Sequence, residues 1–200
     1  MSPRPAGNAA EVIERKPEDD QILVDRILGG DEEAFTLLVE RYSDRTFRLV
    51  RGIVGDWHRS EDVLQEVFVL VYRKLNTFDR RSAFTTWLYR VAVNAALKAR
   101  GRHRNQRLQV LDEGFDQEQK ASVASQRLEL SELAEKLLRC LPAHLRAVIL
   151  LREWEGLSYD EIGQVLSCSR GAVEQRLHRA MVELRRIWKP LGKEEWLHGL

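Results

Sequence analysis

Hydrogen-bond donors are spaced at helical intervals near the C-terminus of this 200-residue chain. When residues 170–186 are placed about 100° apart, one side of the resulting helix carries Gln175, His178, Arg179 and Arg186. The opposite side carries Val173, Leu177, Ala180 and Leu184, which must pack inward. Guanidinium and amide groups donate to phosphates and to base edges, and Arg and Gln can do so with two hydrogen bonds at once. The spacing therefore favours a helix that contacts nucleic acid, although a charged face can also be only a solvated surface.

Two capping signals set the limits of this helix and of a shorter one before it. Ser158, with Glu161 three residues later, has the pattern of a capping box, and apolar residues follow at helical spacing. Residues 167–169 break that spacing, and Ser169 is the expected cap of the second helix. Two helices joined by a tight turn are typical of the helix-turn-helix, whose second helix enters the major groove of DNA. Residues 156–184 therefore predict binding to duplex DNA.

A second helical segment, residues 60–75, has two contrasting faces. Ser60 is its expected N-cap, and the helix macrodipole favours the acids in the turn that follows. Apolar side chains share one side: Leu64, Val67, Phe68, Val71 and Leu75. The other side carries Asp62, Gln65, Glu66, Val69 and Arg73. Because two acids and an amide surround the apolar Val69, this side indicates a docking surface for a basic protein, although single exposed apolar residues are common.

Aromatic and basic residues adjoin in the next segment. Ser82 is the expected cap of a helix that runs to about Gly101 and leads into the basic sequence KARGRHRNQR. Aromatic rings beside cations can hold single-stranded nucleic acid through stacking and charge. The same spacing also fits a helix core, so we assign Phe84 to the core and leave both roles open for Trp87.

Charge is segregated along a chain whose net charge is only +1. Residues 80–111 contain eight Lys or Arg and no acid, whereas residues 112–135 contain seven acids and two basic residues. A near-neutral protein with such a basic block can still bind nucleic acid. Weak periodicity over residues 105–125 indicates a linker, because a loop of that length is unusual inside a compact domain. The sequence thus predicts an all-α fold of two small helical domains joined by a flexible linker: a flexible tail (1–20), a first domain (21–104), an acidic linker (105–125), a second domain that contains the helix-turn-helix (126–188), and a C-terminal tail (189–200).

Several protein classes are excluded by what the sequence lacks. Cys140 and Cys168 have no Cys or His nearby at metal-ligand spacing, and we expect both to be small buried thiols in a reducing compartment. A signal-peptide h-region and a run of about 18 apolar residues are both missing, which predicts a cytoplasmic protein without membrane insertion. The sequence has no Gly-rich phosphate loop and no nucleophile–base pair, so we expect no enzyme, no metal and no cofactor.

Four stretches together resemble the extracytoplasmic-function (ECF) group of the bacterial sigma-70 family: SEDVLQEVFVLVYRKLNTF, SAFTTWLYRVAVNAALKARGRHR, LPAHLRAVILLREWEGLSYDEIGQVL and SRGAVEQRLHRA. They follow the family's order and spacing from about Asp20 to Trp188. The resemblance implies an alternative sigma factor, which binds core RNA polymerase, directs it to particular promoters and helps to open the duplex. It also implies an anti-sigma factor as a partner, through which the protein can be tethered indirectly to a membrane.

The resemblance assigns tasks to residues of the first domain. It matches Asp62, Gln65, Glu66 and Val69 to the helix that docks on the clamp coiled coil of the polymerase's largest subunit. It places Phe78 in the loop that helps to hold a flipped base of the minus-ten element, and it assigns Trp87, Asn94 and Lys98 to the region near that melted strand. Extraction of an unstacked base costs roughly a few kcal/mol, which a pocket and stacking must offset.

The second domain is matched to duplex DNA at the minus-thirty-five element. Glu174, Gln175, His178 and Arg179 match the contact positions of the recognition helix, and Arg152, Arg170 and Arg176 are the candidates for phosphate contacts. Relatives often carry a basic residue where this chain has Glu174, which can accept from cytosine or simply face solvent. The turn also departs from the family, because Ser167 and Cys168 stand where Gly and an aliphatic residue are usual.

A stand-alone helix-turn-helix regulator that binds operator DNA as a dimer is the competing hypothesis. It requires no docking surface for polymerase and leaves residues 60–104 without a task. Binding to a palindromic duplex by the protein alone would favour the regulator, and binding only with core polymerase would favour the sigma factor.

Overall fold

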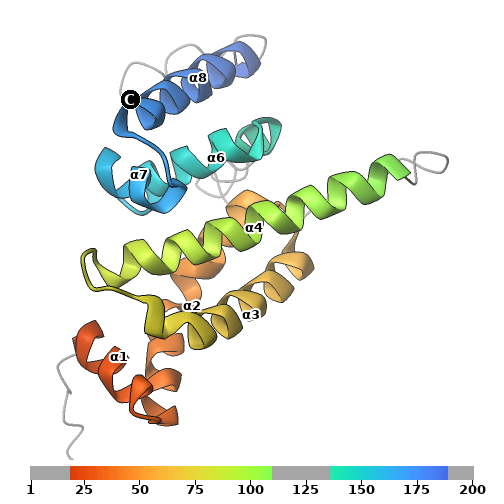
Figure 1. Ribbon diagram of the computed structural model, residues 1–200. Helices are drawn as coiled ribbons and strands as arrows, with labels where there is room; N and C mark the ends of the chain where they lie inside the picture. The colour runs from red at the N-terminus through yellow and green to blue at the C-terminus, as the bar shows by residue number, and fades with distance from the viewer. Residues whose placement is uncertain (1–18, 110–135, 189–200) are drawn as a thin grey trace, which may run out of the picture.

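The computed structural model describes residues 19–109 and 136–188, with residues 103–109 described by their backbone only. Within these ranges the regular elements are all helical, which confirms the predicted all-α fold. The N-terminal lobe contains α1 (Asp20–Leu28), α2 (Glu32–Val54), α3 (Trp57–Lys74), the 3-10 turn η1 (Leu75–Thr77) and α4 (Phe84–Gln109). The C-terminal lobe contains a helical turn at 136–140, α6 (Ala143–Ile149), the π-helical η2 (Leu150–Trp154), α7 (Tyr159–Leu166) and α8 (Arg170–Trp188), as Figure 1 shows.

Acidic N-caps begin three helices of the N-terminal lobe, with Asp19 before α1, Asp31 before α2 and Asp56 before α3. Asp31 precedes α2 and accepts a hydrogen bond from the backbone N–H of Ala34 at 3.1 Å, as an N-cap does. Asp56 accepts from the N–H of Arg59 at 2.9 Å and begins α3 one turn earlier than expected. The expectation that Ser60 caps this helix is therefore wrong. Ser60 is buried in the first turn of α3, and its hydroxyl donates to the Asp56 carbonyl.

The helices α2, α3 and α4 pack around a shared apolar core. Side chains from all three are fully buried, among them Leu38, Leu49, Val67, Val71 and Leu88. Burial stabilises by about 25 cal/mol per Å² of apolar surface, so this core holds the lobe together. The predicted apolar side of α3 is confirmed as the side that packs inward, and its opposite side is left to solvent.

The longest helix, α4, is covered on two sides. Figure 1 shows it lying between α2 and α3 on one side and the C-terminal lobe on the other. Phe84 is 3% exposed, which confirms its assignment to the core, and Tyr89 is 1% exposed because it reaches Glu155 of the other lobe. The helix continues without interruption to Gln109, past its expected end at about Gly101 and past residue 105, where the linker is expected to begin. The remaining predicted linker (110–125), both predicted tails apart from residues 19 and 20, and residues 126–135 lie outside the described ranges.

A capping box begins the helix-turn-helix of the C-terminal lobe. The Ser158 hydroxyl accepts from the Glu161 N–H at 3.3 Å, and the Glu161 carboxylate accepts from the Ser158 N–H at 2.8 Å. Hydrogen bonds from the Ser158 side chain and backbone lower the pKa of the Glu161 carboxyl. The box predicted for α7 is therefore confirmed.

The turn between α7 and α8 depends on a close approach of two backbone segments. Ser167 adopts a left-handed conformation with φ of 50°, and the Cys168 N–H donates to the Gly163 carbonyl at 2.9 Å. A Cβ atom at Gly163 would lie only 2.7 Å from the Cys168 carbonyl oxygen, so the turn requires glycine there. Ser169 then accepts from the Ala172 N–H at 3.3 Å, which confirms it as the start of α8.

The structure corrects one prediction about the cysteines. Cys140 is exposed and Cys168 is half-buried, whereas both were expected to be buried. Leu138 and Leu141 take the inward positions around Cys140, which leaves the thiol on the solvent side. Among the described residues, no helix combines the length and hydropathy that a membrane crossing requires.

Candidate functional site

The outer side of α3 forms a surface that we call the acidic α3 face, made of Asp62, Gln65, Glu66 and Val69. Asp62 and Gln65 are exposed, Glu66 is half-buried, and the Val69 residue is 50% exposed. A valine left in water at the centre of acids and an amide is a small apolar spot with a polar rim, as protein interfaces have. The sequence placed all four residues on one side of the helix, and the structure brings them together there.

A cation from α4 reaches one edge of the acidic α3 face. The Arg102 guanidinium donates to the Glu66 carboxylate at 3.2 Å, and the two side chains are 54% and 36% exposed. An exposed pair of this kind contributes at most about 1 kcal/mol. A partner with a more favourable cation can therefore displace Arg102 at little cost.

An open groove runs between α3 and α4, and we call it the α3–α4 groove. Asn94 and Lys98 line it on exposed positions of α4, and Trp87 lies deeper in it. Lys74 and Arg90 add two further cations, while Glu66 is the only acid among the described lining residues. Such a cationic groove with amide donors and an aromatic ring can hold the backbone and bases of a single nucleic-acid strand.

The ring of Trp87 belongs to an aromatic cluster rather than to the open surface. Trp87 is 5% exposed and Phe78 is 7% exposed, and their ring centroids lie 5.8 Å apart. Phe84 packs edge-on against Phe78 at 5.6 Å. Of the two aromatic residues that the resemblance assigns to the melted strand, Trp87 thus lines the groove while Phe78 packs against it, and both are almost completely buried.

The solvent side of α8 forms the basic α8 face. Gln175, His178 and Arg179 are exposed on it, as the helical spacing predicts, while Val173 and Ala180 are buried on the opposite side. Arg176 is half-buried at the border of the two sides. This arrangement presents one amide, one imidazole and one guanidinium from a single helix, which is the donor set used to read base edges in a major groove.

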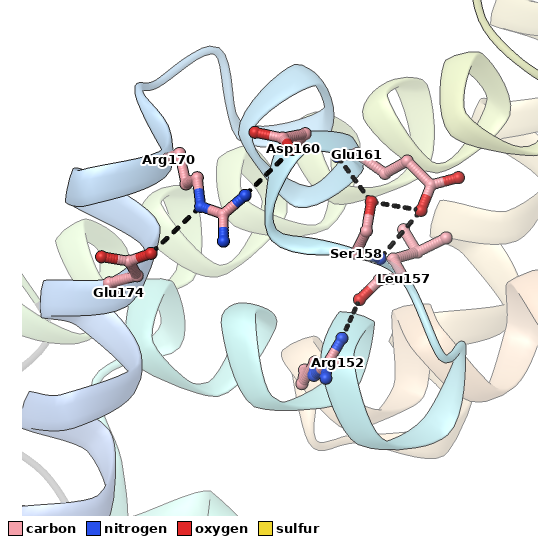
Figure 2. A network of polar contacts seen from close by, with 7 residues as sticks. All are labelled: Arg152, Leu157, Ser158, Asp160, Glu161, Arg170 and Glu174. Atoms are coloured by element: carbon pink, nitrogen blue, oxygen red, sulfur yellow. Dashed lines mark hydrogen bonds and ion pairs between the residues drawn. The ribbon is translucent and has the colours of Figure 1, made fainter.

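A polar network joins the start of α8 to the start of α7, as Figure 2 shows. Arg170 donates to Glu174 at 3.1 Å and to Asp160 at 3.4 Å. Its hydrogen bond to Glu174 and the charge of Asp160 raise the pKa of Arg170, so the group keeps its charge. Glu174 therefore does not stand isolated in solvent but orients a guanidinium at the N-terminal end of α8.

Two of the arginines that are predicted to contact phosphates lie over one aromatic ring. The guanidinium of Arg152 lies 5.0 Å from the ring centroid of Tyr159, and that of Arg170 lies 5.6 Å from it. Arg152 also donates to the Leu157 carbonyl at 2.9 Å (Figure 2). Stacking on an aromatic ring restricts a guanidinium without neutralising it, so the ring leaves the charge of Arg152 available to an anion, whereas Arg170 is also paired with Asp160 and Glu174.

The structure adds to these surfaces several residues that the sequence patterns do not single out. Lys74 and Arg90 belong to the α3–α4 groove, and Tyr159 and Asp160 hold the arginines beside α8. Arg90 shares a side of its helix with the buried Thr86, Tyr89 and Val93, so spacing alone gives no reason to choose it. Tyr159 follows the cap Ser158 directly, and its position beside two arginines arises only when α7, α8 and η2 pack together.

The side chains of the described residues do not gather at a metal site. Within the described ranges, no group of three or more His, Cys, Asp or Glu side chains is placed to hold a metal ion. The chemistry offered by the three surfaces is hydrogen bonding, stacking and charge, which is the chemistry of recognition.

Comparisons with known proteins agree on one family over both lobes. Residues 38–106 match "Sigma-70 region 2" and residues 131–184 match "Sigma-70, region 4". The chain is 37% identical over 188 residues to the RNA polymerase sigma-H factor of Pseudomonas aeruginosa, covering 88% of this chain and 97% of that protein. It is 38% identical over 185 residues to the ECF RNA polymerase sigma-E factor of Escherichia coli K12, covering 86% and 95%. Among solved structures, CnrH in complex with the cytosolic domain of CnrY matches with a TM-score of 0.65 at 28% identity, covering 86% of this chain and 99% of that one.

Proposed function

Because this chain belongs to the ECF group of the sigma-70 family and is an alternative sigma factor that directs transcription initiation, we propose that its three surfaces divide the work of promoter recognition. The acidic α3 face binds core RNA polymerase, the α3–α4 groove holds the melted minus-ten strand, and the basic α8 face reads the minus-thirty-five duplex. The match to both sigma regions in one chain disfavours the stand-alone regulator, which needs only the second of them.

The acidic α3 face suits the coiled coil of the polymerase clamp. Val69 supplies an apolar contact at its centre, and Asp62 and Glu66 offer charge to a basic partner. Charge complementarity of this kind steers association, and the apolar centre adds affinity once water is excluded. On binding, a cation of the polymerase takes the place of Arg102 at the Glu66 carboxylate.

The α3–α4 groove suits a single strand that follows the cationic edge of α4. Asn94 offers an amide to a base or sugar, and Lys98, Lys74 and Arg90 offer charge to phosphates. The cluster of Phe78 and Trp87 gives the groove a stiff aromatic wall, because each ring is fixed by its neighbour. Because both rings are almost completely buried, we assign them the shape of the base pocket and not a stacking platform.

The basic α8 face suits the major groove of a duplex. Gln175 and Arg179 are the base readers, and His178 lies beside them on the same exposed side. Arg152, Arg170 and Arg176 contact phosphates on either side of the groove. Glu174 acts through Arg170, which it holds at 3.1 Å, and it is not needed to contact a base.

One partner and one location follow from this proposal. The solved neighbour CnrH is bound by the cytosolic domain of CnrY, and we infer that this chain is likewise held by an anti-sigma factor. The exposed apolar residues Val69 and Tyr72 on α3 are the place where such a protein competes with polymerase. Since polymerase works in the cytoplasm, we place the protein there, and we assign it no catalytic activity of its own.

The observation that carries the proposal is the exposed Val69 amid acids on α3, together with the exposed donors on α8. The test is capture of core polymerase by purified protein, followed by run-off transcription from genomic promoter fragments. Glu66→Lys is expected to weaken capture about a hundredfold, because it reverses a charge beside the apolar centre of the interface and places a cation against a basic partner. Glu40→Lys, at an exposed acid on α2, is the matched control and should leave capture unchanged. Unaltered capture by Glu66→Lys would remove the acidic α3 face from the proposal.

The DNA side is tested in the reconstituted holoenzyme. Arg179→Ala should lower transcription about tenfold and relax the preference at one base pair of the minus-thirty-five element. Arg185→Ala, an exposed arginine further along α8, is the control and should change neither. A gel shift with the protein alone should show weak and unspecific binding. Tight binding to a palindrome under the same salt would instead support the stand-alone regulator.

A further inference from the structure

The first helix, α1, contributes no residue to the three surfaces described above, yet it is fixed firmly to the N-terminal lobe. Asp20 at its start accepts from Arg41 at 2.8 Å and from the Tyr42 hydroxyl at 2.5 Å. Arg26 near its end is paired with Asp31 at 2.8 Å, and this hydrogen-bonded contact lowers the pKa of the Asp31 carboxyl. A helix that is held at both ends gives a neighbouring segment a rigid support.

The segment beside α1 is a short loop, residues 79–83, which leads into α4 (Figure 1). Its ends are fixed by packing, because Phe78 before it and Phe84 after it are both buried, with ring centroids 5.6 Å apart. Phe78 is also a residue that we assign to the pocket of the flipped minus-ten base. The shape of this pocket therefore depends on what holds the middle of the loop.

Arg80 ties the middle of the loop to α1. Its guanidinium donates two hydrogen bonds to the Asp25 carboxylate, one of them at 3.4 Å. Its neighbours in the loop take another direction, since Asp79 and Arg81 line an open groove that shares Arg90 with the α3–α4 groove. One side chain of the loop thus serves as an anchor, while those on either side of it are presented toward the region proposed to hold the strand.

The backbone conformation of Arg80 needs such an anchor. Its φ of 61° lies in the left-handed region, where the Cβ atom of an L residue crowds the following carbonyl oxygen. Glycine adopts this region freely, whereas an arginine stays in it only when surrounding contacts hold it there. The two hydrogen bonds from Arg80 to Asp25 offset this strain, and they favour one conformation of the loop over the others.

We propose that Asp25 is a positioning residue for minus-ten recognition, which through Arg80 holds residues 79–83 in the conformation that receives the flipped base. The inference rests on the task proposed above for the α3–α4 groove. A loop that is ordered before the strand arrives loses little conformational entropy on binding, and it rejects a base of the wrong shape more strongly. The Asp25 and Arg80 side chains are 58% and 41% exposed, so their pair contributes little to folding. Its effect therefore lies in base discrimination and not in stability.

Base discrimination in the reconstituted holoenzyme is the readout. It is the ratio of run-off transcription from an intact promoter to that from the same promoter with one minus-ten base replaced, each base in turn. Asp25→Asn keeps the shape of the side chain and should lower the largest of these ratios about threefold, with discrimination at the minus-thirty-five element unchanged. Asp44→Asn, at an exposed acid on α2, is the matched control and should change neither. A protein that is only less well folded would lose transcription from all promoters alike, so an unchanged ratio for Asp25→Asn would overturn the proposal.

Changes at residue 80 test the pair itself. Arg80→Gly removes both the guanidinium and the strain, so Asp25→Asn should have no further effect in that background. Charge reversal, Asp25→Arg with Arg80→Asp, should restore the ratio to within about twofold of the native protein, because aspartate tolerates the left-handed region and the pair can form again. A loss from Asp25→Asn that persists beside Arg80→Gly would overturn the proposal, as would a reversed pair that discriminates no better than Arg80→Asp alone.

Nuclear magnetic resonance of the protein alone separates this inference from the proposed function. Backbone order parameters of residues 79–82 should fall in Asp25→Asn and return in the charge-reversed variant. Unchanged order parameters in Asp25→Asn would overturn the anchor and leave the proposed function intact. If the native holoenzyme discriminates at no minus-ten base, the task proposed for the α3–α4 groove fails and the reading role of Asp25 fails with it, while the order parameters still report whether Asp25 holds the loop.

Discussion

In the N-terminal lobe, α2, α3 and α4 are 23, 18 and 26 residues long, whereas α6 and α7 of the C-terminal lobe have 7 and 8 residues. Long amphipathic helices bury enough apolar surface to be held by packing, and isolated helices as short as α7 are unstable in water. The C-terminal lobe therefore depends more on single local features. These are the capping box at Ser158, the left-handed Ser167 and Gly163 of α7, which the turn approaches closely. The difference indicates that single substitutions should affect the two lobes unequally.

The largest effect is expected where the lobes meet. Arg146 of α6 is buried, and its guanidinium donates to backbone carbonyls of both lobes, those of Gly52, Ile53, Arg139 and Leu141. Arg146→Met keeps the length of the side chain but leaves four carbonyls without their donor, and we expect it to lower the free energy of unfolding by about 3 kcal/mol or more. Urea unfolding monitored by circular dichroism measures the change. Arg48→Met, at an exposed arginine of α2, should stay within about 0.5 kcal/mol of the native protein. A loss below about 1 kcal/mol for Arg146→Met would show that the buried cation contributes nothing to either lobe.

A smaller effect is expected inside the turn of the helix-turn-helix. Gly163→Ala brings a Cβ atom to within 2.7 Å of the Cys168 carbonyl, which is backbone and cannot turn aside. Overpacking of this kind costs about 2 kcal/mol, and it should be seen as earlier melting of α7 and α8 with the N-terminal lobe unchanged. Hydrogen exchange resolves the two lobes. Gly171→Ala, where a Cβ meets open space, is the control, and equal losses for both variants would contradict the assigned contact.

The smallest effect is expected at the caps, where the two lobes can be compared directly. Ser158→Ala should cost about 1 kcal/mol and should destabilise α7 more than Asp31→Ala destabilises the longer α2. The Glu161 pKa is lowered in the folded state, so its contribution is present above the unfolded value of about 4.3 and is lost as pH falls through the lower folded value. The stability difference between native protein and Ser158→Ala should shrink over that acidic range. A difference that does not change with pH would mean that the carboxylate half of the capping box adds nothing.

The recognition surfaces were predictable to different degrees. Asp62, Gln65, Glu66 and Val69 lie within two turns of one helix, so their common side followed from a 100° spacing alone. Gln175 and Arg179 were found in the same way. Lys74 and Arg90 were not, because the α3–α4 groove joins two helices and its lining depends on how they cross.

Two residues for which the sequence pattern predicts the wrong position show the same limit of local patterns. Serine is a residue type that often caps helices, which is why Ser60 was expected to do so. Asp56 lies one turn earlier, and its carboxylate accepts a hydrogen bond from the Arg59 N–H, so the helix begins there. Cys140 sits in an apolar stretch, yet its neighbours Leu138 and Leu141 take the inward positions. In both cases neighbouring residues compete for one position, the helix cap or the buried side. The residue types alone do not show which of them will occupy it.

The amino-acid sequence by itself determined the helices, the caps of α7 and α8, the helix-turn-helix and the sides of α3 and α8 that face solvent. These features depend on contacts within a few residues, where helical geometry fixes which side chains meet. Only the tertiary structure decided that Trp87 lines a groove with Phe78 packed against it, that Arg152 and Arg170 lie over the Tyr159 ring, and that Arg146 is buried between the lobes. Such contacts join residues up to 94 positions apart, as Arg146 and Gly52 are, and no local pattern encodes which distant carbonyl a guanidinium will meet.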